Sequence, residues 1–200
     1  PRVLAELVRT CRRATTRLLL VKLSPNVTSI AEMARVCEGE GADGLSLINA
    51  VQGLLVDVHR RRTVLRNGLG GLSGPAILPI ALRMVFQAAR AVKLPICGIG
   101  GIASGEDAVA FLLCGASAVQ VGTITYTDPG AGIEIRDGIE AYCRQHGVAR
   151  VRDLIGALEP AVPEQPDHRD ALHLVLLCER RLVVDVHLDD LVRTLAHSCH

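Results

Sequence analysis

Short apolar runs recur along the chain, and each one ends in a polar or glycine-rich turn. Four of them have the length of a strand: RLLLVKL (17–23), GLSLIN (44–49), LPICGIG (94–100) and SAVQVGT (117–123). Because these runs are almost continuously apolar, we expect both faces of the strands to be covered. The pattern therefore predicts the buried strands of a parallel sheet.

A helical pattern follows each of these runs. Ser29 and Glu32 have the spacing of a capping box at the start of the first helix, and Gly41 ends that helix. Pro75 suits the first position of the second helix, because the N–H that proline lacks is not needed there. Together the patterns predict helices over residues 29–41, 75–91, 104–115 and 135–147.

The chain is thus predicted to contain four β-α units, with short links except for a long polar connection after the second strand. A sheet of this kind is either doubly wound or part of a (β/α)8 barrel. A doubly wound sheet gathers its ligand groups at one switch point, whereas a barrel collects them from several strands. Polar or glycine residues follow all four strands here, which favours the barrel, although four units form only half of one.

The composition narrows the class of protein. The chain has 200 residues, of which 49% are hydrophobic and 22% charged, and this allows one globular domain with a real core. The net charge of +1 argues against a nucleic-acid partner and against a membrane surface. The run of arginines at 60–62 is therefore expected to be a solvated loop rather than a binding patch.

The cysteines and the absence of apolar spans indicate a cytoplasmic protein. Seven cysteines are present and none forms a C-x-x-C pair, which favours reduced thiols over a disulfide framework. No apolar run reaches membrane-spanning length, and no signal peptide is visible. The chain starts with Pro1 instead of Met, so we expect it to be a piece of something longer.

Two polar side chains stand out at the strand ends. Lys22 interrupts an apolar strand, and an ammonium that points into a barrel needs an anion or an electron-rich ligand. The competing interpretation is a lysine that snorkels at the strand end. Asn49 offers a donor and an acceptor to a planar ligand, although an asparagine at this place is also typical of a strand cap or a turn.

Glycine-rich loops predict a phosphate site. Gly98, Gly100 and Ala103 have the G-x-G-x-x-A spacing of a dinucleotide-binding turn, but no acidic residue closes the next strand to hold a ribose. That strand ends instead in Gly122-Thr123, a pair suited to further phosphate donors. The turn Ser73-Gly74-Pro75 either supplies N–H groups to the same ligand or is a plain loop. We therefore expect a phosphate group other than that of NAD at these loops.

Five segments, in this order along the chain, carry a resemblance to a known family: VKLSPNVTSIAEMA, GADGLSLINA, NGLGGLSGPAILPIALRMV, PICGIGGIASGEDAVAFLLCGASAVQVGT and IEIRDGIEAYCRQHGV. Over residues 3–158 the chain resembles the C-terminal half of a dihydroorotate dehydrogenase. Within that family it is most similar to the class 1B, NAD-linked catalytic subunit. Dihydropyrimidine dehydrogenase, a relative, shares the flavin half of the pattern.

The resemblance implies a partial TIM (β/α)8 barrel, made of the last four βα units, plus a C-terminal tail that does not match. It implies an FMN enzyme that oxidises dihydroorotate to orotate in de novo pyrimidine biosynthesis. Lys22 would lie beside the flavin N1/C2-carbonyl edge and stabilise the reduced, anionic flavin, and Ile48 would contact the flavin through its backbone. The residues implied around the ribityl phosphate are Gly74, Gly100, Gly101, Gly122 and Thr123.

The substrate contacts implied by the resemblance are Asn49 and the residue after it. The family usually has a hydroxyl residue there, whereas this chain has Ala50. The loss of one hydrogen bond to an anionic substrate costs about 1.5–3 kcal/mol, roughly one to two decades in affinity. A related flavoprotein that acts on pyrimidine bases, similar to dihydropyrimidine dehydrogenase, therefore stays an alternative.

The resemblance also implies a catalytic base that this chain does not contain. In the family, a cysteine in an Asn-Ile-Ser-Cys-Pro-Asn-like motif removes the C5 proton, and it precedes the strand of Lys22, so we expect it upstream of Pro1. Cys11, in a helical pattern, and Cys97, within a strand, are expected to be packing or surface residues. We assign no catalytic residue, and we expect these 200 residues to be inactive on their own.

The family pattern further implies a partner subunit. Electrons would leave FMN for a subunit that carries FAD and an iron–sulfur cluster and reduces NAD, and the implied assembly is a homodimer within a heterotetramer. The alternative is a non-catalytic module: a half barrel that binds FMN or another phosphate weakly, or that folds only with a partner.

The predicted domain organisation has three parts: a half barrel over 1–158, a linker over 159–167 and a tail of unknown role over 168–200. The tail contains five histidines and two cysteines, at positions 168, 173, 187, 197 and 200 and at 178 and 199. Their spacing fits no standard zinc site, so we predict no metal centre.

Overall fold

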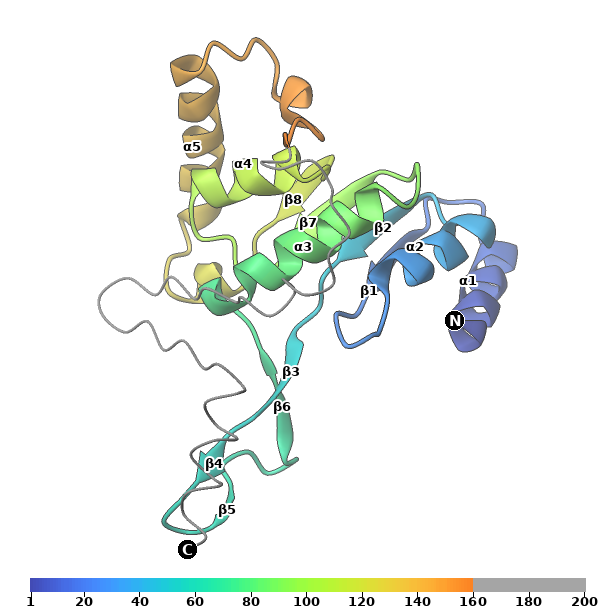
Figure 1. Ribbon diagram of the computed structural model, residues 1–200, viewed down its shortest axis with the longest axis vertical. Helices are drawn as coiled ribbons and strands as arrows, with labels where there is room; N and C mark the ends of the chain where they lie inside the picture. The colour runs from blue at the N-terminus through green and yellow to red at the C-terminus, as the bar shows by residue number, and fades with distance from the viewer. Residues whose placement is uncertain (160–200) are drawn as a thin grey trace, which may run out of the picture. The chain divides into compact units, whose positions relative to one another are not determined.

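The computed structural model describes residues 1–159, which form an α/β fold around one parallel sheet (Figure 1). The sheet has four strands in the order β1-β2-β7-β8. Their bounds are β1 Leu20–Leu23, β2 Gly44–Leu47, β7 Ile96–Ile99 and β8 Ala118–Gln120. Each strand lies inside one of the predicted apolar runs and pairs in parallel with its neighbour, so the predicted parallel sheet is confirmed.

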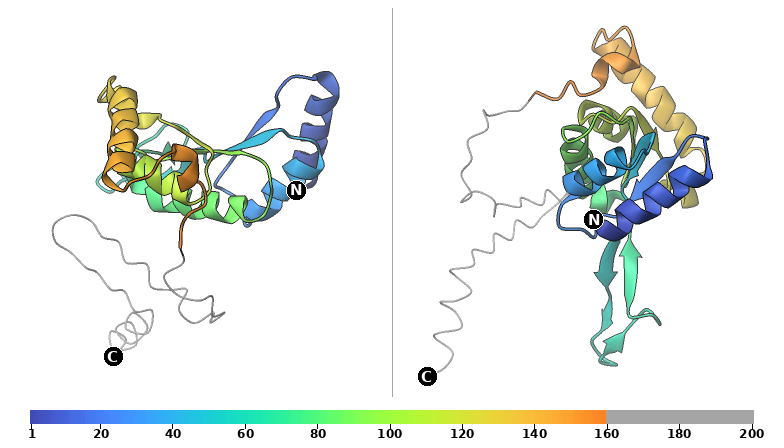
Figure 2. Two further views of the ribbon diagram at one scale, coloured as in Figure 1. Left: turned by 90° about the horizontal axis from the view of Figure 1, so that it is seen from above. Right: turned by 90° about the vertical axis from the view of Figure 1, so that its right-hand side faces the viewer.

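Helices connect these strands and pack against one another in chain order. They are α1 Arg2–Ala14, α2 Ile30–Gly39, α3 Leu78–Ala89, α4 Gly105–Leu113 and α5 Ala131–Gln145, with 3-10 turns η1 Pro75–Ile77, η2 Thr123–Tyr126 and η3 Val151–Leu154. Each helix contacts the next, so that the five helices form one row. Figures 1 and 2 show α1 and α5 at opposite ends of this row. Pro75 begins the 3-10 turn η1 rather than the α-helix itself, which starts at Leu78.

Side-chain caps determine where two of these helices begin. Ser29 Oγ accepts a hydrogen bond from the Glu32 N–H (3.2 Å) at the start of α2. At the start of α4, Ser104 Oγ accepts from the Asp107 N–H (3.1 Å), and Asp107 Oδ2 accepts from the Ser104 N–H (3.0 Å). Such caps satisfy N–H groups that the first helical turn leaves without a partner. The cap of α4 therefore holds the helix directly behind the loop that follows β7.

The two faces of the sheet differ in what covers them. Side chains on the face toward the helices are buried: Leu23, Leu45, Leu47 and Ile96. On the other face, which we call the inner face, Lys22 and Gln120 are exposed, and Leu20 is 46% exposed. The expectation that both faces are covered is therefore wrong for the part of the chain that the structure describes.

The strand order bears on the choice between a doubly wound sheet and a segment of a (β/α)8 barrel. A doubly wound sheet reverses its strand order at a switch point. Within residues 1–159, the four-stranded sheet has no such reversal, because its strands lie side by side in the order in which they occur along the chain. Within the same residues, β1 and β8 each pair with a single neighbour, so the sheet has two open edges.

The polar connection predicted after the second strand contains an antiparallel hairpin that the sequence patterns did not indicate. Its strands are β3 Val51–Leu54 and β6 Leu69–Leu72, with a smaller pair, β4 Val56–Asp57 and β5 Arg62–Thr63, at the tip. We call residues 51–72 the arm, and Figure 1 shows it projecting away from the sheet and helices. The arginines at 60–62 are exposed near its tip, and Arg62 lies in β5 rather than in a loop.

Residues 160–200 lie outside the described part of the chain. The predicted tail over 168–200, with its histidines and cysteines, falls there, as does the predicted linker over 159–167 apart from its first residue. The domain boundaries therefore stay predictions. In residues 1–159, no helix has the length and apolar character needed to cross a membrane.

Candidate functional site

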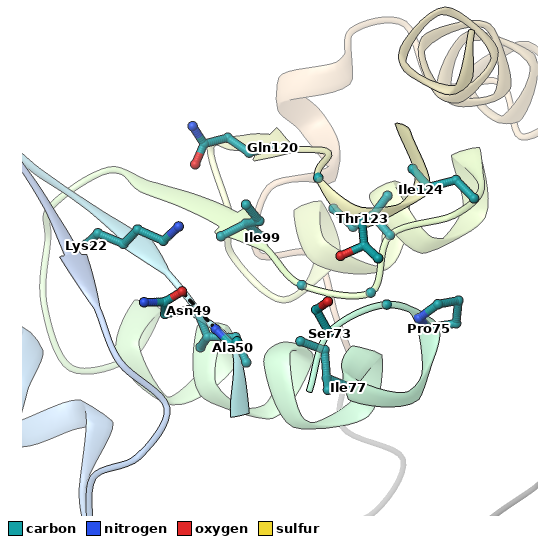
Figure 3. Close-up of a pocket in the computed structure, with 16 residues that line it drawn as sticks. Lys22, Asn49, Ala50, Ser73, Pro75, Ile77, Ile99, Gln120, Thr123 and Ile124 are labelled. Carbon is teal, nitrogen blue, oxygen red and sulfur yellow. Dashed lines mark hydrogen bonds between the residues drawn. The ribbon is translucent and has the colours of Figure 1, made fainter. Parts of the chain in front are cut away.

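A pocket opens where the carboxyl ends of the four parallel strands meet (Figure 3). All nine site residues implied by the family resemblance line it: Lys22, Ile48, Asn49, Ala50, Gly74, Gly100, Gly101, Gly122 and Thr123. The structure therefore brings together residues that are up to a hundred positions apart in the chain. Their individual roles toward a ligand stay predictions.

The Lys22 side chain reaches this pocket from β1. It alternates with Leu23, which is buried on the helix side, so the ammonium lies on the inner face. Figure 3 shows the side chain extending over the pocket. Lys22 forms no ion pair with any residue between 1 and 159. A positive charge without a carboxylate partner fits an anionic or electron-rich ligand, as the strand pattern predicted.

Two of the pocket glycines are needed for packing. Gly100 has φ +133°, and a Cβ there would lie 2.9 Å from Ala81 Cβ on α3. Gly101 has φ +80°, and its Cβ would lie 2.7 Å from the Leu78 backbone nitrogen. Both distances are too short for a side chain, so these glycines let the loop after β7 contact the start of α3. The loop has a structural role whether or not it binds a ligand.

The remaining pocket glycines are not tightly packed against the protein. A Cβ on Gly122 would meet no atom within 4 Å, and one on Gly74 would meet only Thr123 Cγ2, at 3.6 Å. Close packing within the protein therefore does not explain the absence of a side chain at Gly122. The open space leaves room for a ligand to approach the backbone there.

Backbone donors at these loops are available to a ligand. The N–H groups of Gly100, Gly101, Gly122 and Thr123 have no hydrogen-bond partner within residues 1–159. They come from two neighbouring strand ends and line the same pocket. Convergent backbone N–H groups bind phosphate oxygens without a charged side chain. The geometry is thus suited to the phosphate end of a ligand.

Asn49 and its neighbour close the pocket at the end of β2. The Asn49 side-chain oxygen accepts from the Ala50 N–H (2.9 Å), which leaves the carboxamide NH2 as a donor. The Ile48 N–H donates to the Ile99 carbonyl (2.7 Å), so of the Ile48 backbone only the carbonyl oxygen can take a further partner. Ala50 contributes a methyl group and no hydroxyl.

The sequence analysis missed Gln120. It lines the pocket at the end of β8, and its carboxamide oxygen accepts a hydrogen bond from Ser46 Oγ (2.9 Å). The signal for it was present, because Gln120 is a polar residue within an apolar strand, as Lys22 is. The same reasoning that identified Lys22 would have found it. Ser73 and Pro75, from the turn considered in the sequence, also line the pocket, and the lining residues not considered there are Ile77, Ile99, Ile102 and Ile124.

The described cysteines have the environments expected of packing and surface residues. Cys11 is exposed on α1, and Cys97 lies within β7. Burial raises the pKa of the Cys97 and Cys114 thiols, and it raises the pKa of Cys37 to about 11. Burial thus favours the protonated form of these three thiols.

Comparisons with a family model and with curated proteins both match the chain to dihydroorotate dehydrogenases. Residues 1–142 match the family model described as dihydroorotate dehydrogenase. The chain is 57% identical over 159 residues to the dihydroorotate dehydrogenase B (NAD(+)) catalytic subunit of Trichlorobacter lovleyi. These aligned residues cover 80% of this chain and 52% of that protein. The protein of the same name from Pelobacter propionicus is 56% identical, over 80% of this chain and 52% of its own length. The one from Porphyromonas gingivalis is 54% identical, over 77% of this chain and 50% of its own length. The chain thus spans about half the length of the curated relatives it matches.

Proposed function

The chain belongs to the dihydroorotate dehydrogenase family, and from this premise we propose that it forms part of an FMN-dependent catalytic subunit that oxidises dihydroorotate to orotate. The observation that carries the proposal is the pocket at the four strand ends, where all nine residues implied by the family pattern lie together. The catalytic-subunit names of the relatives support the same reaction.

The pocket residues fit FMN. The open space beside Gly122 and the available N–H groups of Gly100, Gly101 and Thr123 suit a phosphate. Lys22 and Asn49 lie on the side of β1 and β2, where they would face the flavin ring. FMN, when bound, supplies the acceptor for the hydride that leaves the substrate. Lys22 holds a positive charge beside the ring, and the loops hold the phosphate.

The parallel sheet is proposed to be half of a TIM barrel. Four successive βα units in chain order, with helices on one face and ligand groups at the carboxyl ends, support a barrel segment. The inner face, uncovered by residues 1–159, would then point to the barrel interior. We propose that turnover belongs to the complete barrel and that the 200-residue chain is inactive without it. The catalytic cysteine would come from the other half.

Electron transfer is proposed to involve a second subunit. The relatives are named as catalytic subunits of NAD(+)-type enzymes, which supports a partner that carries electrons from FMN to NAD. We assign FAD and an iron–sulfur cluster to that partner. We also propose that two catalytic subunits form a homodimer, and that this homodimer is part of a heterotetramer.

Ala50 favours a second candidate substrate. It occupies the position after Asn49 where the family usually has a hydroxyl, so an anionic substrate loses one hydrogen bond there. A pyrimidine base without the carboxylate, such as dihydrouracil, would lose less. This candidate keeps the FMN site and changes only the substrate.

The test compares the product of the complete open reading frame that contains this chain, called here the complete gene product, with the 200-residue chain. We expect the complete gene product to be yellow and its flavin to be bleached anaerobically by dihydroorotate. The 200-residue chain should show no bleaching. Bleaching by dihydrouracil but not by dihydroorotate would select the second candidate, and a complete gene product that binds no FMN would overturn the proposal.

A further inference from the structure

The inner face carries a hydrogen-bonded pair that the family pattern does not assign. Strand register puts Lys22, Ser46 and Cys97 in one row across the sheet, and Ile99 and Gln120 in the next row toward the carboxyl ends. Side chains in these rows point to the same face because direction alternates along a strand. Gln120 on β8 therefore shares a face with Lys22 on β1.

Ser46 fixes the orientation of the Gln120 carboxamide. Its Oγ donates to Gln120 Oε1 (2.9 Å), so the bond crosses from β2 to β8 over the intervening β7. Ser46 is only 3% exposed, and Gln120 is the one side-chain partner of its hydroxyl within residues 1–159. A buried hydroxyl that loses its partner is costly. The pair is therefore expected to persist when a ligand enters the pocket.

The bond leaves Gln120 as a donor. A carboxamide has one acceptor oxygen and an NH2 group with two hydrogens. The oxygen is held by Ser46, and the Nε2 hydrogens have no partner within the described residues. Figure 3 shows Lys22 and Gln120 near Ile99, with the Gln120 oxygen on the side of Lys22, and Pro75 at the far end of the pocket. The Lys22 ammonium and the Gln120 carboxamide NH2 are thus both donors on the inner face of the sheet.

We infer that Ser46 and Gln120 form a positioning pair that presents the Gln120 carboxamide NH2 as a hydrogen-bond donor to the flavin ring. The inference rests on the proposed function. Gln120 contacts the ring, and Ser46 acts through Gln120. Donors without a competing acceptor favour a ring that carries negative charge on its oxygen and nitrogen atoms. The pair therefore binds reduced, anionic flavin more tightly than oxidised flavin and raises the midpoint potential.

The test measures FMN affinity and midpoint potential in the complete gene product. Gln120→Met removes the donor at nearly the same length and should weaken binding of reduced FMN about three- to tenfold. If the loss reaches tenfold for the reduced form alone, the potential falls by about 30 mV. Ser46→Ala should shift both quantities in the same direction but less, and should add nothing in the Gln120→Met background.

Controls separate this role from a structural one. Gln87→Met makes the same change on the exposed surface of α3 and should leave both affinity and potential unchanged. If Gln120→Met does not fold, Gln120→Glu keeps the size and should lower the potential, because a carboxylate repels the reduced ring. Unchanged potential in folded Gln120 variants, with FMN bound, would overturn the inference alone. A wild-type protein without affinity for FMN would overturn the proposed function and the inference together.

Discussion

The pocket glycines show that one residue type can be required for two different reasons. At Gly101 the protein itself occupies the place of a side chain, since the Leu78 nitrogen lies 2.7 Å from where a Cβ would stand. At Gly122 nothing within residues 1–159 comes within 4 Å of that place. Packing within the protein therefore accounts for the first glycine, and the second leaves room for the proposed ligand. Their substitutions should have different consequences.

We predict that Gly122→Ala weakens FMN binding while the melting temperature stays within about 2 °C of the wild type, as for a change that meets no protein atom. Gly101→Ala should lower the melting temperature by several degrees, because its Cβ contacts backbone and φ is positive. Thermal melts of the flavin-free proteins and FMN titrations of both variants check this. Equal loss of stability in the two variants would show that Gly122 also serves packing.

Helices and strands differ in how far the sequence predicts them. The four strands and the helices α2–α5 were found because apolar periodicity, Ser29, Ser104 and the terminal glycines are local signals. The arm was missed because its strands contain glycine and exposed leucine, which give no alternating pattern. The site was predicted from strand ends, since parallel strands bring their carboxyl ends together. Gln120 was missed although, like Lys22, it is a polar residue within an apolar strand. Only its bond to Ser46 depends on register, which one sequence does not show.

Asp43 connects three elements and gives the fold a pH dependence. Asp43 lies just before β2 begins. Its Oδ2 accepts a hydrogen bond from the Leu19 N–H (2.7 Å), directly before β1, and another from the Arg12 guanidinium (2.7 Å) on α1. The Leu19 N–H and then Arg12 lower the pKa of the Asp43 carboxyl. The charged form is thus favoured by folding. Its contribution to stability is present above the unfolded pKa of about 3.9 and is lost as pH falls through the lower, folded pKa.

We predict that Asp43→Asn lowers the melting temperature at pH 7 and that the difference from wild type shrinks as pH falls below about 4. The amide keeps the shape of the side chain but lacks the charge that the Leu19 N–H and Arg12 stabilise. Melting curves between neutral and acidic pH check this, with Asp137→Asn on the exposed side of α5 as the control. A difference that stays constant across the range would mean that the charge of Asp43 does not stabilise the fold.

Exposed apolar side chains gather on the arm, and others lie elsewhere in the described part of the molecule, among them Val3 on α1, Leu20 on the inner face and Tyr126 in η2. The arm carries eight large hydrophobic residues with 43–71% exposure: Leu54, Leu55, Val56, Val58, Val64, Leu65, Leu69 and Leu72. On the inner face of the described sheet, Leu20 is the only large hydrophobic strand residue exposed to a similar degree, at 46%, and the same face carries the polar Lys22 and Gln120. Contiguous exposed apolar surface of this size promotes association. The arm should therefore dominate self-association of the chain.

We predict that a trimmed chain, with residues 54–69 replaced by Asn-Gly, has a larger monomer fraction than the 200-residue chain in size-exclusion chromatography with light scattering. Asn-Gly supports a two-residue hairpin turn, and Gly53 and Gly70 already face one another across β3 and β6. The four-stranded sheet takes no strand from the deleted segment, so the melting temperature should change little. Leu20→Lys on the inner face is the matched control and should reduce association less. If Leu20→Lys restores the monomer and trimming does not, the uncovered face of the sheet drives association instead of the arm.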